Sequence, residues 1–288
     1  MAQYDFSTQK ELFNISCQIL SDYEIIDWSF GGGTALSTLF FQHRMSYDID
    51  IFSEDFSAIQ RLIGNKEEIA KNLGIDMIEV KSSPAGITFG LDDGGLKLDF
   101  VYSPALSSDP YTVVKDVFGH TNIKVQTPLE IIAKKLKHRE KATIRDFVDY
   151  AIVEDRSRLL TKLKSEGIVD IERYFDVVEK FNSFDSCVFN EELENLLPKQ
   201  NLTKDDFRNT INNLMKPKEL IRVALDYTNE VVAFDEFIEP YRSTYEELGK
   251  YSIYTIKNNG ISYKDVLKLG FEDILELSKN IKDNPKHL

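Results

Sequence analysis

The stretch FGGGTALSTLFFQHRMSYDIDIF, residues 30–52, decides how this chain folds. It follows a predicted strand at residues 25–30, passes through three consecutive glycines and enters a predicted helix at residues 34–42. Glycine lets the backbone approach a ligand closely, and the first turn of a helix offers unpaired N–H groups to an anion. The stretch therefore predicts a phosphate-binding turn between strand and helix. Its predicted phosphate contacts are Gly32, Gly33 and Thr34.

Two aspartates near the end of this stretch, Asp48 and Asp50, alternate with isoleucines. Successive side chains of a strand point to opposite faces, so the two carboxylates share a face. The strand predicted at residues 96–102 repeats this scheme and carries Asp99 on its polar face. If these strands are neighbours, three carboxylates converge and repel one another unless a cation neutralises them. Their hard oxygen atoms suit Mg²⁺, and two such ions about 3.5–4 Å apart serve nucleotidyl displacement.

The rest of the N-terminal part continues to mix helices and strands. The dipeptide Asp93-Gly94 is a strong hairpin signal immediately before the strand at residues 96–102. The further elements predicted here are helices at residues 7–20 and 57–73 and strands at residues 75–82, 87–92 and 122–126.

After Pro128 the hydrophobic period changes from two to about 3.6, which is typical of amphipathic helices. We find no convincing strand beyond this point. We therefore predict an α/β (α+β) fold, in which a mixed sheet with flanking helices, residues 1–127, precedes a helical domain, residues 128–288. The first part of that domain, residues 128–155, is expected to complete the active site. Its two apolar stripes are Leu129, Ile132, Ala133 and Leu136, then Ile144, Phe147, Val148, Ala151 and Ile152.

Charge and composition limit the partners of this chain. Its net charge of −13 argues against indiscriminate binding to nucleic acid, because phosphate contacts need cations. The segment 124–145 departs from this balance, with seven basic residues against two acidic ones. We see no secretory signal and no apolar run near the roughly 20 residues that span a bilayer. We expect a cytoplasmic protein with no membrane partner.

The motifs together resemble the AbiEii/AbiGii toxin family, a branch of the DNA polymerase beta nucleotidyltransferase superfamily. The similarity begins with GGTAL at residues 32–36, HRxSxDIDxF at 43–52 and LDF at 98–100. It continues with LExxAxKL at 129–136, then Arg139, and RDxxD at 145–149. The resemblance implies a polymerase beta-like mixed sheet and the catalytic residues of that superfamily.

The resemblance also implies roles for the acidic residues. Asp48 and Asp50 would coordinate metal ions that hold a nucleoside triphosphate, and Asp99 would bind the second metal and help to deprotonate or orient the attacking hydroxyl. Asp146 lies three residues after Thr143, so it either caps a helix or belongs to the site. The same two alternatives hold for Asp149.

Basic residues would contact the phosphates. Lys135 and Arg139 flank the first apolar stripe, and Lys135 is either a triphosphate contact or a lysine that lies along the surface. Lys134 and His138 are expected nearer the solvent. Two further residues of the resembling block either touch phosphate or brace the loop before Asp48; they are Arg44 and Ser46.

These expectations define an Mg²⁺-dependent transferase that moves a nucleoside monophosphate from a nucleoside triphosphate to a hydroxyl. The favoured acceptor is an RNA end, specifically tRNA, and the resemblance implies a toxin of a toxin–antitoxin or abortive-infection system with a cognate antitoxin. The alternatives are a small acceptor such as an aminoglycoside, a protein hydroxyl, or a catalytically degenerate interaction module.

Overall fold

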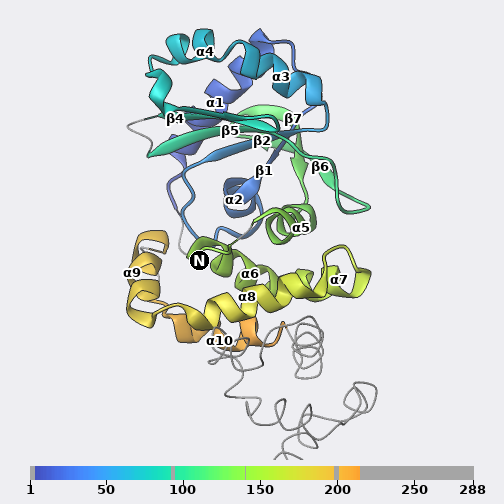
Figure 1. Ribbon diagram of the computed structural model, residues 1–288, viewed down its shortest axis with the longest axis vertical. Coiled ribbons are helices and arrows are strands. Elements are labelled where there is room, and N and C mark those ends of the chain that lie inside the picture. The colour runs from blue at the N-terminus through green and yellow to red at the C-terminus, as the bar shows by residue number, and fades with distance from the viewer. Residues whose placement is uncertain (1–3, 92–94, 140, 198–200, 215–288) are drawn as a thin grey trace, which may run out of the picture.

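Seven strands form one mixed sheet in the order β3-β4-β5-β2-β1-β7-β6 (Figure 1). The computed structural model describes residues 4–91, 95–139, 141–197 and 201–214. β2 runs parallel to β5 and β1 runs parallel to β7, whereas the other neighbouring strands are antiparallel. The strands are β1 (Ser29–Gly31), β2 (Ile49–Ser53), β3 (Val80–Ser83), β4 (Gly86–Leu91), β5 (Leu96–Tyr102), β6 (Tyr111–Val117) and β7 (His120–Gln126).

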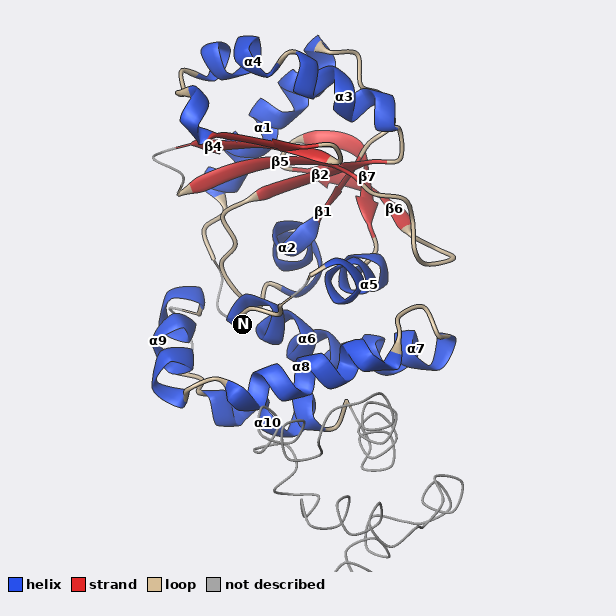
Figure 2. Ribbon diagram, viewed as in Figure 1, coloured by secondary structure: helices blue, strands red, loops and turns tan. Residues whose placement is uncertain are grey.

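Helices cover both faces of the sheet (Figure 2). One face carries α1 (Ser7–Asp22), α3 (Phe56–Gly64) and α4 (Lys66–Leu73). The other carries α2 (Gly32–Ala35), which continues into a π-helical segment at Leu36–Phe41, and α5 (Pro128–His138). Beyond α5 lies a helical layer made of α6 (Ile144–Ser157), α7 (Leu159–Glu166), α8 (Ile171–Ser183), α9 (Ser186–Leu196) and α10 (Lys204–Asn212).

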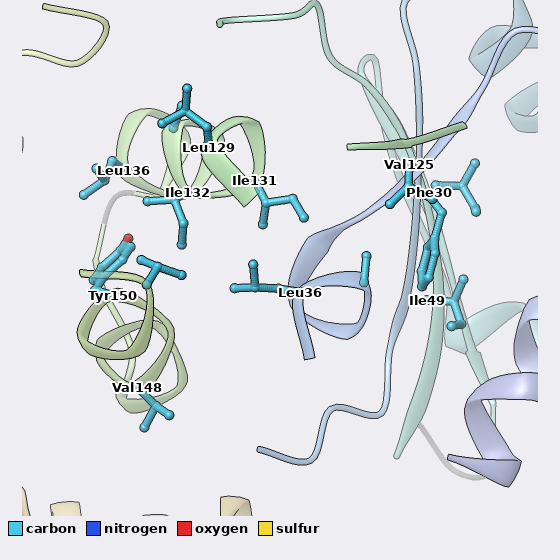
Figure 3. Packing of buried hydrophobic residues seen from close by; sticks show 14 of the residues in the cluster. Phe30, Leu36, Ile49, Val125, Leu129, Ile131, Ile132, Leu136, Val148 and Tyr150 are labelled. Atoms are coloured by element: carbon cyan, nitrogen blue, oxygen red, sulfur yellow. The ribbon is translucent and has the colours of Figure 1, made fainter. Parts of the chain in front are cut away.

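The hydrophobic core runs from the sheet through α2 and α5 into the helical layer. Figure 3 shows Phe30, Ile49 and Val125 on the sheet, Leu36 opposite them, and the apolar residues of α5 and α6 beyond. Both predicted apolar stripes face this core, and all their residues are buried except Ile152, which is partly buried. α5 therefore lies between the sheet and α6 and is covered on two sides (Figure 2).

The predicted architecture, a mixed sheet with flanking helices followed by helices, is confirmed for the described residues, but some elements differ. The first strand is shorter than expected, because Ile25 is buried after α1 while Ile26 is 91% exposed. Met77–Glu79 forms a short 3₁₀ helix, so the strand predicted at residues 75–82 reduces to β3 at the edge of the sheet. β6 was not predicted. The Asp93-Gly94 turn and residues 215–288 of the predicted helical domain lie outside the described residues.

In the part of the chain that the structure describes, no helix combines the length and apolarity needed to cross a membrane.

Candidate active site

Three aspartates gather at the centre of the sheet because β2 and β5 are parallel neighbours. Asp50 and Asp99 are register partners, and Asp48 immediately precedes β2. Ile49 and Leu98, which alternate with them, are buried in the core. The three carboxylates line a cavity of about 240 Å³, so the strand alternation predicted from the sequence brings them to one place.

The three carboxylates lie close enough for the negative charge on one to oppose ionisation of the others. Burial, followed by repulsion from Asp99 and Asp48, raises the pKa of Asp50 to about 7, although Lys135 and Arg139 oppose the shift. Burial also raises the pKa of Asp99, against a hydrogen bond from the hydroxyl of Thr88. A cation bound between the three carboxylates would relieve this repulsion.

The donor set fits Mg²⁺ when substrate phosphates complete the coordination. All three donors are carboxylate oxygens, the hard ligands that Mg²⁺ prefers. Among the described residues, no group of three or more acidic, histidine or cysteine side chains is placed so that it could hold a metal ion by itself. Mg²⁺ commonly uses one or two carboxylates together with water and substrate phosphates, so such a cluster is not required.

The glycine turn gives these side chains the space they occupy. Gly32 has a φ of +67°, and a Cβ atom there would lie 1.9 Å from Oδ2 of Asp50. A Cβ atom on Gly33 would lie 2.3 Å from Nη2 of Arg44. Glycine is therefore needed at both positions, because side chains of the site itself occupy the space that a Cβ atom would fill. Phosphate binding by the turn would not by itself impose this requirement.

Thr34 and Ser46 hold the loop that carries Asp48. Both are buried, and the two hydroxyl oxygens lie 2.9 Å apart. The hydroxyl of Thr34 also hydrogen-bonds the backbone carbonyl of Asp48. Ser46 accepts a hydrogen bond from the side chain of Gln9 at its own carbonyl. In this structure both residues position this loop, residues 42–48, which we call the aspartate loop.

Replacing Gly32 with alanine is expected to reduce both folding stability and nucleotide transfer. The left-handed backbone costs a non-glycine residue about 1–2 kcal/mol, and the added methyl group would also displace Asp50. Gly74 is a matched control, because its φ is +69° but nothing lies within 4 Å of its Cβ position. Urea denaturation should show a larger loss for Gly32→Ala than for Gly74→Ala, and only Gly32→Ala should impair transfer. Equal losses would contradict the close packing against Asp50.

A buried ion network joins the aspartate loop to α6. Arg44 donates from Nε and Nη2 to the two carboxylate oxygens of Asp149, at 2.7 and 3.0 Å. Nζ of Lys135 lies 3.0 Å from Asp149, and Nε2 of His43 lies 2.7 Å from it. Burial would raise the pKa of Asp149, but Arg44, Lys135 and His43 outweigh it and hold that pKa well below its usual value. The network clamps the loop against the helical layer.

Asp146 caps α6 and also contacts two cations that line the carboxylate cavity. One carboxylate oxygen accepts hydrogen bonds from the backbone N–H and hydroxyl of Thr143, at 2.9 and 2.8 Å, and caps α6. The other accepts from Nζ of Lys135 at 2.8 Å and lies 3.3 Å from Nε of Arg139. Lys135 and Arg139 both line the carboxylate cavity, so Asp146 holds two cations at its wall.

The expected exposure of Lys134 is wrong. Its side chain is only 6% exposed, and Nζ donates to the carbonyl oxygen of Ser103 at 3.1 Å and lies 3.4 Å from Glu130. The apolar stripe of α5 predicts one buried face, with Lys134 on the side exposed to solvent. In the structure α5 is covered on two sides, and Lys134 lies on the second of these. His138 is exposed, as predicted.

Several residues around the aspartates were assigned no role from the sequence. Lys97 and Arg145 line the carboxylate cavity, and Nη1 of Arg145 lies 3.5 Å from Oδ2 of Asp48. Lys97 could have been found, since it shares a strand face with Asp99. Thr88, which binds Asp99 from β4, carries no signal in its local sequence.

Comparison with known proteins identifies the family. The model of the family described as nucleotidyl transferase AbiEii toxin, type IV toxin–antitoxin system, matches residues 20–240. Comparison with curated proteins gives no match.

Two solved structures are similar in outline. MenT4, a nucleotidyltransferase toxin from Mycobacterium tuberculosis H37Rv, is 14% identical, with 90% of this chain and 91% of that chain covered and a TM-score of 0.45. JHP933 from Helicobacter pylori is 12% identical, with 79% and 99% covered and a TM-score of 0.40. Because both TM-scores are below 0.5, membership rests on the sequence match, which covers most of the chain. The protein belongs to the AbiEii toxin family and is a nucleotidyltransferase.

Proposed function

We propose that this enzyme transfers a nucleoside monophosphate from a nucleoside triphosphate to the hydroxyl of an RNA end, with Mg²⁺ as the metal. One observation carries the proposal. Asp48, Asp50 and Asp99 share a single cavity with Lys135 and Arg139, so carboxylates suited to a metal ion and cations suited to phosphate line the same space. This arrangement suits in-line phosphoryl chemistry, because metal held by the carboxylates and the cationic side chains would both neutralise the negative charge of a polyphosphate.

The residues of the chain divide the work of the reaction. Asp48 and Asp50 would hold the metal, and Lys135 and Arg139 would bind non-bridging phosphate oxygens. Asp99 would orient the acceptor hydroxyl and accept its proton as the oxygen attacks the α-phosphorus and pyrophosphate leaves. Bound Mg²⁺ would neutralise the negative charge that develops on the phosphate oxygens.

The acceptor would meet a cationic surface beside the aspartates. A neighbouring cavity of about 230 Å³ shares Lys135 and Arg139 with the site and adds Lys141, Arg173 and Lys180. Among the described residues, the acidic ones that line it are Asp176 and Glu179. Such a surface suits an RNA backbone and repels a cationic aminoglycoside. The overall charge of −13 would keep non-specific RNA binding weak.

Calorimetric titration with the four ribonucleoside triphosphates tests the metal site. We expect binding that needs Mg²⁺ and that disappears in Asp48→Asn/Asp50→Asn, because both metal-binding carboxylates are lost. Asp109→Asn/Asp116→Asn is the matched control, since neither of its residues lines the carboxylate cavity. Triphosphate binding that ignores Mg²⁺, or that survives the double substitution, would refute the proposed metal site.

The acceptor is tested by incubating the enzyme with labelled nucleotide, total RNA and a panel of aminoglycosides. We expect label on RNA, concentrated in tRNA, and a loss of that label in Lys141→Ala/Arg173→Ala with triphosphate binding retained. Label on an aminoglycoside or on protein, with none on RNA, would overturn this choice of acceptor.

The biological consequence is growth arrest that depends on catalysis. Induced wild-type enzyme should stop growth, whereas equally abundant, folded Asp48→Asn/Asp50→Asn should not. A partner antitoxin should then restore growth when it is expressed with the wild type. Arrest by the double variant would show that toxicity does not require nucleotide transfer.

A further inference from the structure

A second cavity, larger and less polar than the carboxylate cavity, opens beside it. Its volume is about 510 Å³, within the range of roughly 300–1,000 Å³ that small-ligand sites span. It is continuous with the aspartate site, because Gly33, Asp50, Lys135 and Arg139 line both cavities. Its other walls are mostly apolar and include Phe52, Val101 and Ile131, from β2, β5 and α5.

Gln126, the last residue of β7, contributes a buried amide to this cavity. Its side chain is 0% exposed, yet neither the amide nitrogen nor the amide oxygen has a hydrogen-bond partner among the described residues. The amide lies against the glycine turn: a Cβ atom on Gly31 would stand 2.5 Å from Oε1. Because β7 is the parallel neighbour of β1, the sheet itself brings this amide beside the turn.

An unpartnered buried amide is costly, since folding removes its bonds to water without replacing them. Most buried polar groups in proteins are paired, so an exception calls for a functional explanation. The hydroxyl of Ser103, only 7% exposed, lines the same cavity and also lacks a hydrogen-bond partner in the described part of the chain. Two such groups in one apolar cavity are the pattern of a ligand site with a few specific polar contacts.

We propose that this cavity holds the nucleobase of the nucleoside triphosphate and that the Gln126 amide hydrogen-bonds the edge of the base. The inference rests on the proposed function, because the carboxylate cavity is taken as the seat of the phosphates. An amide presents one acceptor and one donor side by side, which complements a base edge with an adjacent donor and acceptor. Apolar walls suit the faces of a planar ring, and the shared residues link base to phosphate. Gln126 is therefore the residue that determines nucleotide preference.

The test is calorimetry on the full-length chain with Mg²⁺, using the four ribonucleoside triphosphates and inorganic tripolyphosphate, which has no base. The wild type should prefer one base by roughly fivefold to 150-fold, the range that one bidentate base contact gives. In Gln126→Met this preference should vanish, while tripolyphosphate binding stays unchanged. Its melting temperature should not fall, because methionine fills the same space without an unpartnered amide.

Two further variants serve as controls. Tyr174→Phe removes a buried hydroxyl that has no hydrogen-bond partner among the described residues, and Tyr174 lines neither of the two cavities. It should match Gln126→Met in stability but keep the wild-type nucleotide preference. Gln126→Glu exchanges the amide NH₂ for a carboxyl oxygen, so it should change which base is preferred. A thermal melt without nucleotide checks that this variant is folded.

The outcomes separate this inference from the proposed function. If the wild type binds all four triphosphates equally, or if Gln126→Met and Gln126→Glu keep its ranking, the base site is refuted while the metal site stands. If Gln126→Met raises only the KM for RNA, the cavity belongs to the acceptor and the inference is wrong. If neither triphosphates nor tripolyphosphate bind with Mg²⁺, the proposed function fails and this inference fails with it.

Discussion

Asp50→Asn is expected to lower nucleotide transfer by about a thousandfold or more while making the metal-free protein more stable. Loss of a metal-binding carboxylate removes several kcal/mol of transition-state stabilisation, and about 4 kcal/mol corresponds to a factor of about a thousand. The stability gain follows because burial and the neighbouring aspartates penalise the charged form of Asp50, whereas asparagine carries no charge. Transfer assays and thermal melts measure the two effects.

The pH dependence of this gain has a definite direction. The pKa of Asp50 is raised from 3.8 to about 7 in the folded state, so ionisation destabilises the fold. The advantage of Asp50→Asn should be absent below about pH 4, grow between pH 4 and 7, and be complete above pH 7. Added Mg²⁺ should raise the melting temperature of the wild type and leave that of the variant unchanged. A less stable asparagine variant at pH 8 without metal would contradict the crowding of the three carboxylates.

Asp149→Ala is expected to destabilise the fold by about 3–5 kcal/mol, the cost of removing one partner of a buried ion pair. Arg44 is 2% exposed and Lys135 is 8% exposed, so neither cation could recover its hydration. Equilibrium denaturation gives the free energy of unfolding directly. The aspartate loop would also lose its clamp, and transfer should fall in parallel.

Asp27→Ala is the matched control, because it breaks an ion pair with Lys124 whose side chains are 65% and 34% exposed. Exposed pairs contribute about 0–1 kcal/mol, so this variant should be close to wild type. The low pKa of folded Asp149 means that its contribution is present above the unfolded value of 3.8 and is lost as pH falls below it. A cost for Asp149→Ala as small as that of Asp27→Ala would refute the clamp.

The parts of the fold that follow from local sequence were predictable. β2 and β5 alternate buried and polar residues, so their faces could be assigned without knowing their neighbours. β6 could not, because this edge strand is mostly exposed and Val113, a residue typical of strands, is 63% exposed. Lys134 was misplaced because the number of faces that a helix buries depends on tertiary packing.

The candidate site was likewise predictable only where it depends on local sequence. The three aspartates and the glycine turn lie in short motifs, whose spacing on strands predicts a shared face. The contacts that support them join distant segments, as in Arg44 and Asp149, which are separated by 105 positions. The buried amide of Gln126 was invisible in the sequence, because only the sheet order places it beside the glycine turn.

That separation of 105 positions between Arg44 and Asp149 also sets an order of events during synthesis. A ribosome adds about 5–20 residues per second, so roughly 5–20 seconds pass between the emergence of the arginine and that of its counter-ion. Until then the aspartate loop cannot take its native position, because the guanidinium of Arg44 would be buried without an opposite charge. A chain stopped before residue 149, by a nonsense codon or a stalled ribosome, would carry all three aspartates and no working site. Abortive translation would therefore release no active nucleotidyltransferase.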